Sequence, residues 1–330
     1  MAQPQQRPAV GVVRFYNFLP EAESFLDDVL AGLARPQKTL PPKYFYDARG
    51  CELFEKICTL PEYYPTRTEL AIMREHAGAM AKFLGPDCQL VEFGSGSSTK
   101  TRILIEQLRP PLYVPIDIAG EAIRAAAAGL AQALPWLNIN GVCADYTRPL
   151  TLPEFVGVPI RRKAVYFPGS TIGNFTPHEA IEFLKLARRL VGPEGALLIG
   201  VDLKKDKPVL DAAYDDAAGV TAEFNLNLLA RINRELDGHF DLAQFAHEAR
   251  WNARQSRIEM HLRSRIDQQV SIDAINLTVS FTEGETIWTE SSHKFRAAEI
   301  RRMGERAGWQ RSRQWLDRGW GFAETLFTAS

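Results

Sequence analysis

The chain has 330 residues, of which 45% are apolar and 24% are charged, and its net charge is close to −1. This composition is that of a globular protein, and the lack of a basic excess argues against nucleic acid as a partner. No run of about 18 apolar residues could span a membrane, and the first residues carry no secretory signal pattern. We therefore expect a cytoplasmic protein that acts on small molecules and, because no apolar helix seam stands out, a monomer.

Residues 87–201 alternate between short apolar runs and helical periodicity. Strands are predicted at 89–93, 112–116, 137–144, 164–167 and 196–201, and helices between them at 99–108, 121–134 and 178–191. Such alternation is typical of βαβ units with a parallel sheet. Ligands of these sheets bind beyond the carboxyl ends of the strands. Here those ends carry the segments 92–96 and 168–174 and the acids Asp117 and Asp145.

The pattern changes after residue 203. Helices are predicted at 208–221 and 223–236, followed by strand-like alternation at 249–262, 269–278 and 285–290. A helix at 297–307 and strands at 310–316 and 322–327 close the chain. We predict that residues 204–294 are an insertion that packs against the N-terminal segment. The predicted domains are therefore 69–203 with 295–330, and 1–68 with 204–294.

The loop after the first strand of this segment reads Gly94-Ser95-Gly96-Ser97-Ser98-Thr99-Lys100. It is not a P-loop, because Thr99 and not a glycine precedes Lys100. It also lacks the third glycine of the dinucleotide fingerprint, which lets a helix approach a diphosphate closely. The loop therefore predicts a ligand without a diphosphate.

The acids at the next two strand ends indicate a nucleoside. Asp117 could accept hydrogen bonds from both hydroxyls of a ribose, Asp145 from an adenine amino group, and Tyr146 could pack against the adenine ring. S-adenosylmethionine (SAM) fits this description, with Glu92 and backbone N–H groups of the glycine loop around its amino-acid part. This part of the chain resembles the class I (Rossmann-like) methyltransferase fold.

Three segments could hold an acceptor for the methyl group. The loop 168–175 has two glycines, and its Asn174 offers both a donor and an acceptor. The segments 42–50 and 60–69 hold four of the nine tyrosines, a cluster that core packing would also explain, although 61–65 is too polar and proline-rich for a core element. Glu290 and Ser292 project from one face of a predicted strand and could bind a ring with two nitrogens; a solvated edge strand would show the same pattern.

Five motifs together carry a specific resemblance. They are PKYFYD at 42–47, PEYYPTRTE at 61–69, EFGSG at 92–96, PGSTIGNF at 168–175 and TESSHKF at 289–295. The chain resembles the histidine N-alpha-methyltransferases of ergothioneine biosynthesis from about residue 12 to its C-terminus. The resemblance implies SAM-dependent trimethylation of the α-amine of L-histidine to hercynine. It also implies a class I α/β domain with a second, smaller α+β substrate domain built from the N-terminus and an insertion.

The resemblance further implies roles for individual residues. It puts the histidine carboxylate and amine on Asn174 and Tyr214, and Tyr46 near the reacting amine. Acceptor positions of the family, including the imidazole contacts and one pocket wall, are matched by Tyr63, Asn174, Tyr214, Met260, Glu290 and Ser292. Cofactor positions are matched by Gly94, Lys100, Asp117, Asp145 and Tyr146, beside the Glu92 and Gly96 of the loop itself.

Two alternatives stay open at this point. The acceptor could be another amino acid such as a tryptophan derivative, although its ring needs a larger, apolar pocket than Glu290 and Ser292 would provide. A nucleoside-binding protein without catalysis would leave Asn174 and Tyr214 without a role. No metal is expected, because the four cysteines form no CxxC pair and none lies near a histidine at the spacing of a zinc site.

Overall fold

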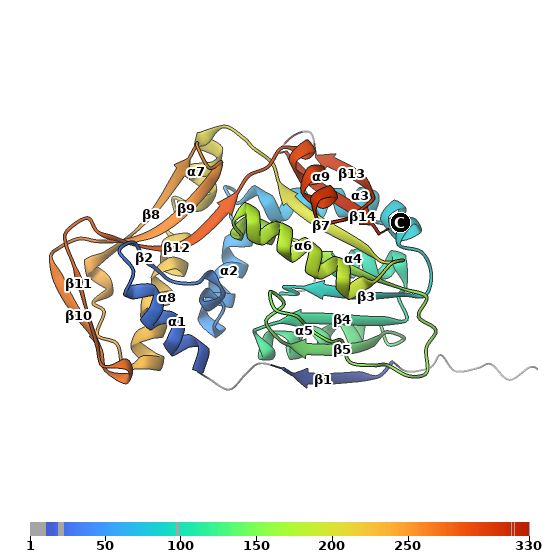
Figure 1. Ribbon diagram of the computed structural model, residues 1–330, viewed down its shortest axis with the longest axis horizontal. Coiled ribbons are helices and arrows are strands. Elements are labelled where there is room, and N and C mark those ends of the chain that lie inside the picture. Colours follow the sequence, from blue (N-terminus) through green and yellow to red (C-terminus); the bar gives the residue numbers. More distant parts are fainter. Residues whose placement is uncertain (1–10, 19–22, 97–98, 318, 320, 330) are drawn as a thin grey trace, which may run out of the picture.

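The computed structural model describes residues 11–18, 23–96, 99–317, 319 and 321–329. The segment 1–10, where we predict no secretory signal, and Ser97 and Ser98 of the glycine loop lie outside these ranges. Figure 1 shows a large sheet flanked by helices on one side of the molecule and a smaller group of strands and helices on the other.

The large sheet has eight strands in the order β1-β5-β4-β3-β6-β7-β14-β13. The strands from β1 to β7 in this order are parallel, whereas β14 and β13 are antiparallel additions. The chain order reverses at β3, so the loops after β3 and β6 meet at the kind of switch point where α/β sheets bind ligands. The bounds are β1 (Val13–Asn17), β3 (Cys88–Phe93), β4 (Leu112–Asp117), β5 (Asn138–Cys143), β6 (Arg162–Phe167), β7 (Ala196–Asp202), β13 (Arg311–Asp317) and β14 (Phe322–Thr328).

Helices bury both faces of the large sheet. One core lies under α3 (Tyr64–Leu84), α4 (Thr99–Leu108) and α5 (Gly120–Ala133), and the opposite core lies under α6 (Pro177–Val191) and α9 (Ala297–Arg306). Successive strand residues such as Leu90 and Val91 enter opposite cores, which is why these strands read as continuous apolar runs. The predicted Rossmann-like α/β fold is therefore confirmed.

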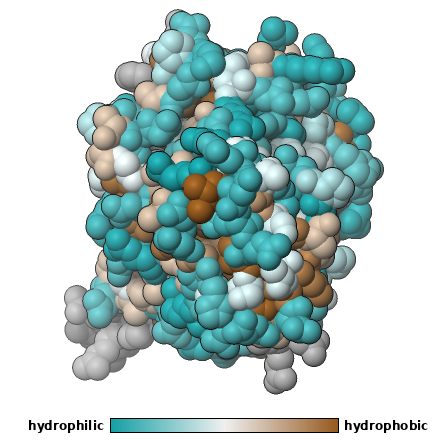
Figure 2. Space-filling view, turned by 90° about the vertical axis from the view of Figure 1, so that its left-hand side faces the viewer, coloured by the Kyte–Doolittle hydropathy of each residue, from teal (hydrophilic) through white to brown (hydrophobic). Residues whose placement is uncertain are grey.

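The smaller part has its own core. It contains a four-stranded sheet in the order β2-β12-β9-β8 and a separate hairpin of β10 and β11. Figure 2 views this end of the molecule and shows a mostly hydrophilic surface. The strands are β2 (Lys38–Thr39), β8 (Phe245–Asn252), β9 (Arg257–Ser264), β10 (Gln268–Ile272), β11 (Leu277–Phe281) and β12 (Thr286–His293). The helices packed with them are α1 (Glu23–Leu33), η1 (Pro42–Phe45), α2 (Ala48–Thr59), α7 (Lys207–Tyr214) and α8 (Val220–Leu236).

Two predictions about the N-terminal segment are wrong. β1 pairs in parallel with β5 at the edge of the large sheet, although residues 1–68 are predicted to belong wholly to the second domain. Four of its five residues are exposed, so no burial pattern marks this strand. Tyr64 and Pro65 are buried in the first turn of α3, although the segment 61–65 is predicted to lie outside the core.

The insertion also differs from its predicted elements. The helix predicted at 208–221 ends at Tyr214, and a new helix starts at Val220. The break is stabilised by Asp216, whose carboxylate accepts hydrogen bonds from the backbone N–H groups of Val220 (2.9 Å) and Thr221 (2.7 Å). The strand-like stretches 249–262 and 269–278 each fold as an antiparallel hairpin with a turn inside the predicted run.

Gly200 in β7 leaves room for two buried carboxyl groups. A Cβ at this position would overlap Oε1 of Glu69 and lie 3.0 Å from Oε1 of Glu324, and both acids have no exposed surface. Gly200→Ala should therefore destabilise the fold by about 1–3 kcal/mol or more, as overpacked cores do. Thermal unfolding measures the effect. The matched control is Gly129→Ala in α5, where a Cβ meets nothing within 4 Å. This change should raise the free energy of unfolding by about 0.5–1 kcal/mol. A Gly200→Ala protein that unfolds at the wild-type temperature would contradict this packing argument.

Candidate active site

The glycine loop follows β3 at the switch point of the large sheet. Gly94 and Gly96 have φ angles of +69° and +44°, in the left-handed region that favours glycine. A Cβ on Gly94 would lie 3.8 Å from the hydroxyl of Tyr146, so the tyrosine stands directly over the loop. The loop and Tyr146 therefore lie together at the carboxyl edge of the sheet.

The acids at the ends of β4 and β5 lie on the same edge. Oδ1 of Asp117 accepts a hydrogen bond from the N–H of Ala119 at 3.0 Å, and burial raises the pKa of Asp117 while N–H groups, including that of Gly96, lower it. Asp145 closes its own turn by accepting from the N–H (2.9 Å) and the hydroxyl (2.5 Å) of Thr147. Asp117 thus borders the glycine loop directly.

Tyr146 belongs to an aromatic group at this edge. Its ring stacks on Phe93 with centroids 5.4 Å apart and an interplanar angle of 19°. The two rings line an open cavity together with Leu150 and Leu190. Arg148 and Arg189 also line this cavity, so Tyr146 offers a ligand aromatic and apolar surface next to two basic side chains.

Glu92 and Lys100 are placed differently from the other predicted cofactor residues. Glu92 is 1% exposed and accepts hydrogen bonds from the hydroxyls of Thr101 and Tyr113. Burial raises its pKa to about 8, against the lowering effect of these two hydrogen bonds and of Lys100. The Lys100 ammonium lies 2.5 Å from Glu69, whose carboxylate also accepts the N–H of Gly169 at 2.8 Å. Glu92 therefore supports the loop from inside the core, and Lys100 ties α4 to the loop after β6.

The opposite wall of the site comes from β12. Glu290 lies opposite Met260 of β9, and Ser292 lies opposite Ile258. Met260 and Ile258 both belong to the core of the smaller part, so Glu290 and Ser292 share its inner face. Burial raises the pKa of Glu290 to about 7, while the positive charge of Lys294 acts in the other direction.

Three tyrosines gather around Glu290. The rings of Tyr63 and Tyr214 meet edge to face with centroids 6.3 Å apart. Burial raises the pKa of Tyr46, Tyr63 and Tyr214, and the negative charge of Glu290 contributes to each of these shifts. The carboxylate of Glu290 is therefore within electrostatic reach of all three hydroxyls.

Residues at the carboxyl edge of the large sheet also affect the pKa of Tyr46. After burial and Glu290, the groups that raise its pKa include Tyr146 and Asp117. Its ring is held by edge-to-face contacts with Phe54 (5.6 Å) and Phe224 (5.9 Å). Tyr46 is therefore within electrostatic reach both of Glu290 and of the residues at the carboxyl edge of the large sheet.

Asn174 lies where the large-sheet part meets β12. It is the last residue of η2 (Thr171–Asn174), in the loop after β6, and it is half-buried. The neighbouring Gly173 carbonyl accepts a hydrogen bond from Nδ1 of His293 at 2.9 Å, and a Cβ on Gly173 would lie 2.9 Å from the His293 carbonyl oxygen. η2 is thus packed tightly on β12 at the end of the Glu290 wall.

A buried network of hydrogen bonds around Lys294, which the sequence motifs do not predict, lies next to this wall. Lys294 has no exposed side-chain surface and donates to the hydroxyls of Tyr214 (2.8 Å) and Ser292 (2.9 Å). It also pairs with Asp202 at 2.8 Å, and Tyr64 donates to the same carboxylate at 2.6 Å. Two sequence signals point to these residues, because Lys294 follows Ser292 at strand period and Asp202 is another strand-end acid.

The described part of the chain shows neither a metal site nor a membrane span. Within it, no group of three or more histidine, cysteine, aspartate or glutamate side chains could hold a metal ion. None of the helices in these ranges is long and apolar enough to cross a membrane. The four cysteines are free thiols.

Together, the sheet order, the glycine loop and the strand-end residues are those of a class I SAM-dependent methyltransferase. The chain belongs to the family described as "Histidine-specific methyltransferase, SAM-dependent", whose model matches residues 25–329.

Three relatives show what the chain is similar to. It is 44% identical over 309 residues to the histidine N-alpha-methyltransferase of Mycolicibacterium smegmatis, which covers 92% of this chain and 95% of that protein. It is 33% identical over 214 residues to ergothioneine biosynthesis protein 1 of Neurospora crassa, covering 62% of this chain and 24% of that protein. It is 27% identical over 172 residues to the 4-dimethylallyltryptophan N-methyltransferase of Claviceps purpurea, covering 49% of each.

Proposed function

We propose that this enzyme transfers three methyl groups from SAM to the α-amine of L-histidine, which gives hercynine in the first step of ergothioneine biosynthesis. The observation that carries the proposal is the inner face of β12, where Glu290 and Ser292 project together and the Ser292 hydroxyl lies 2.7 Å from that of Tyr214. The similarity to the mycobacterial enzyme over almost its whole length supports the same acceptor. We further propose that the protein acts in the cytoplasm as a monomer and needs no metal.

The proposed donor site is the carboxyl edge of the large sheet, in the part formed by residues 69–203 and 295–330. The residues present fit a nucleoside methyl donor, because the left-handed glycines leave the loop backbone open and a strand-end carboxylate borders it. When bound, SAM supplies an electrophilic methyl group on a positively charged sulfur. The residues that we propose to surround it are Gly94, Gly96, Asp117, Asp145 and Tyr146, with Glu92 and Lys100 as supports.

The proposed acceptor site is formed by residues 1–68, β1 excepted, and 204–294, together with Asn174. Asn174 and Tyr214 would bind the carboxylate and amine of histidine. Glu290 and Ser292 would bind the two ring nitrogens, with Tyr63 beside them and Met260 as the wall. A carboxylate on the wall of the pocket selects for a ring that carries an N–H donor, because other rings would leave it unpaired.

Each transfer requires a neutral amine, since an ammonium has no lone pair. Even the α-amine of a peptide has a pKa of about 7.7–8.0, so the α-amine of a free amino acid is largely protonated at neutral pH and must lose a proton before it reacts. Burial raises the pKa of Tyr46 well above its usual value, so the phenol keeps its own proton and is a poor base. We propose that Tyr46 accepts a hydrogen bond from the amine and relays protons through water.

The aromatic side chains also suit the product. A quaternary ammonium cannot donate hydrogen bonds, but the face of an aromatic ring attracts it by about 0.5–2 kcal/mol. Tyr46 is the ring that we propose for this contact. Its neighbour Phe45, which the sequence also suggests, has no exposed surface and stacks on Phe224 at 4.5 Å, so it supports the pocket from the core. The contribution of the Tyr46 ring would grow as the amine gains methyl groups.

Mass spectrometry tests the function directly. Incubation of the purified enzyme with SAM and a mixture of amino acids should give one product, histidine heavier by about 42 mass units for three methyl groups. A mass gain on any other amino acid, or none at all, would contradict the proposal.

A tryptophan derivative is the second candidate acceptor, because the Claviceps relative is named for one. The Glu290 carboxyl on the wall beside Met260 opposes a bulky indole at this position. Including tryptophan and 4-dimethylallyltryptophan in the same mixture decides between the two acceptors.

A further inference from the structure

β12 carries a bulge directly before Glu290. Trp288 lies opposite His261 and Glu290 lies opposite Met260, so one residue of β12, Thr289, is extra in the register. In a regular strand, alternation from Ile287 would turn Glu290 to the opposite face. The bulge resets the alternation, and Glu290 follows Thr289 on the inner face.

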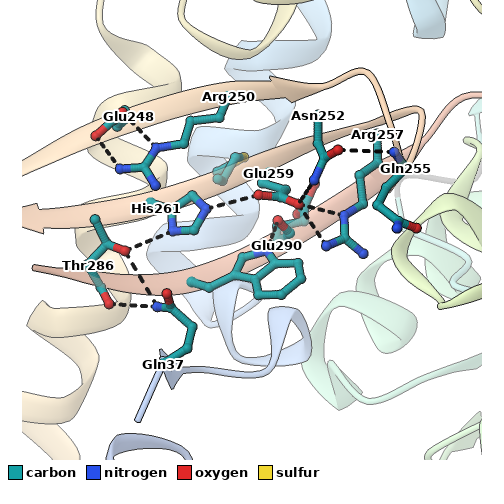
Figure 3. Close-up of polar contacts among 12 residues, drawn as sticks. Gln37, Glu248, Arg250, Asn252, Gln255, Arg257, Glu259, His261, Thr286 and Glu290 are labelled. Atoms are coloured by element: carbon teal, nitrogen blue, oxygen red, sulfur yellow. Dashed lines mark hydrogen bonds and ion pairs between the residues drawn. The ribbon is translucent and has the colours of Figure 1, made fainter. Parts of the chain in front are cut away.

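The outer face of the same strands carries a separate layer of polar side chains. Figure 3 shows a layer of polar contacts over β8, β9 and β12, in which Glu259 binds Arg257, and His261 lies 3.2 Å from the hydroxyl of Thr286. Arg257 also covers the ring of Trp288 at 4.4 Å. Without the bulge, the Glu290 carboxylate would join this layer and leave the acceptor wall.

The bulged residue is held by α8. The hydroxyl of Thr289 lies 2.8 Å from Oδ1 of Asn225 and 3.0 Å from the carbonyl oxygen of Met260. Thr289 is 1% exposed and Asn225 has no exposed surface. The Asn225 amide donates in turn to the carbonyl of His261 (3.0 Å) and to Nδ1 of His247 (2.9 Å).

His247 forms hydrogen bonds with both Asn225 and the backbone of Tyr214. Its Nε2 lies 2.8 Å from the backbone carbonyl oxygen of Tyr214, which can only accept, so Nε2 carries the hydrogen and Nδ1 accepts from Asn225. Every polar atom of the Asn225 side chain is therefore used in one orientation. The chain Thr289–Asn225–His247 links the residue before Glu290 to the backbone of Tyr214, two walls of the same pocket.

We propose that Asn225, through Thr289 and His247, is a positioning residue that fixes Glu290 relative to Tyr214 and thereby sets selectivity for the acceptor. This inference rests on the proposed binding of the histidine imidazole by Glu290. None of the three residues needs to touch the substrate. Loss of one link would loosen the pocket on the acceptor side and leave the donor side unchanged.

Thr289→Val tests the first link, because valine keeps the shape and removes the hydroxyl. We expect the KM for histidine to rise roughly 5- to 100-fold, the range for a buried hydrogen-bond partner left unpaired. The KM for SAM should stay within about twofold. Thr289→Ser, which retains the hydroxyl, should restore most of the histidine KM. Asn225→Asp, which cannot donate to His247 or His261, should reproduce the valine effect.

The matched control is Thr286→Val, which removes a buried hydroxyl from the same strand on its outer face. It should leave the KM for histidine unchanged. Equal rises in both KM values, a rise in the control, or wild-type KM values in both test variants would overturn the inference. Loss of cooperative unfolding in Thr289→Ser would overturn it as well, because the hydroxyl alone would then not hold the bulge in place. A wild-type enzyme that does not methylate histidine would instead overturn the proposed function.

Discussion

Replacement of Glu290 by alanine should raise the KM for histidine by roughly 10- to 100-fold. The change removes the one carboxylate of β12 that faces the inner wall and leaves an imidazole N–H without an acceptor in a buried place. A hydrogen bond to a charged group is worth about 1.5–3 kcal/mol, which gives this range. Steady-state kinetics with histidine and SAM varied in turn measures it. The KM for SAM should hardly change, and equal effects on both substrates would remove Glu290 from the acceptor pocket.

The pH profile gives a second measure of the same residue. Burial raises the pKa of Glu290 to about 7, so its carboxyl is increasingly protonated below pH 7 and loses the negative charge that strengthens its hydrogen bond with the imidazole. In the wild-type enzyme, kcat/KM for histidine should therefore fall as the pH falls through about 7. Glu290→Gln should lose this limb and keep those that come from the amine and imidazole of the substrate. An unchanged profile in the variant would assign the limb to another group.

Replacement of Tyr46 by phenylalanine should lower kcat by roughly 100-fold or more, the range for a lost proton-transfer group. The ring contacts with Phe54 and Phe224 do not involve the hydroxyl, so the pocket should keep its shape. Single-turnover kinetics separates the chemical step from product release. SAM binding, measured by calorimetry, should stay the same.

Tyr44→Phe is the matched control for this variant. Tyr44 lies in η1, the short helix that Tyr46 caps, and its hydroxyl donates to Asp28 at 2.6 Å. Its kcat should equal that of the wild type. A Tyr46→Phe enzyme with full turnover would end the proton-relay hypothesis and leave Tyr46 as a wall of the pocket.

The parallel sheet could be predicted closely from the sequence because its strands are buried on both faces. An apolar run that ends at a glycine or an acid marks such a strand in a single sequence, as at Phe93 and Asp117. β1 carries no such signal, because its residues are mostly exposed and only its backbone pairing with β5 places it. The break between α7 and α8 depends on a capping carboxylate, Asp216, inside a run that is otherwise helical.

The acceptor wall could be predicted only in part. Period two places Glu290 and Ser292 on one face, but it does not say whether that face is the inner one. The bulge at Thr289 decides this, and it depends on a contact with Asn225 on a distant helix. The positions of Lys294 and Asp202 arise in the same way, because they meet only where the carboxyl ends of β12 and β7 come together, next to the bridge between Leu203 and Phe295. The roles of the predicted site residues remain predictions for the experiments above.

The separate core of the smaller part has an evolutionary consequence. Its buried residues, among them Met260 and Ile287, are distinct from those of the two layers around the large sheet. Substitutions in the core of the smaller part therefore change its packing and leave the two cores around the large sheet unaltered. Most of the proposed acceptor residues lie in the smaller part, so related enzymes can evolve to methylate another amino acid while the proposed SAM site stays the same.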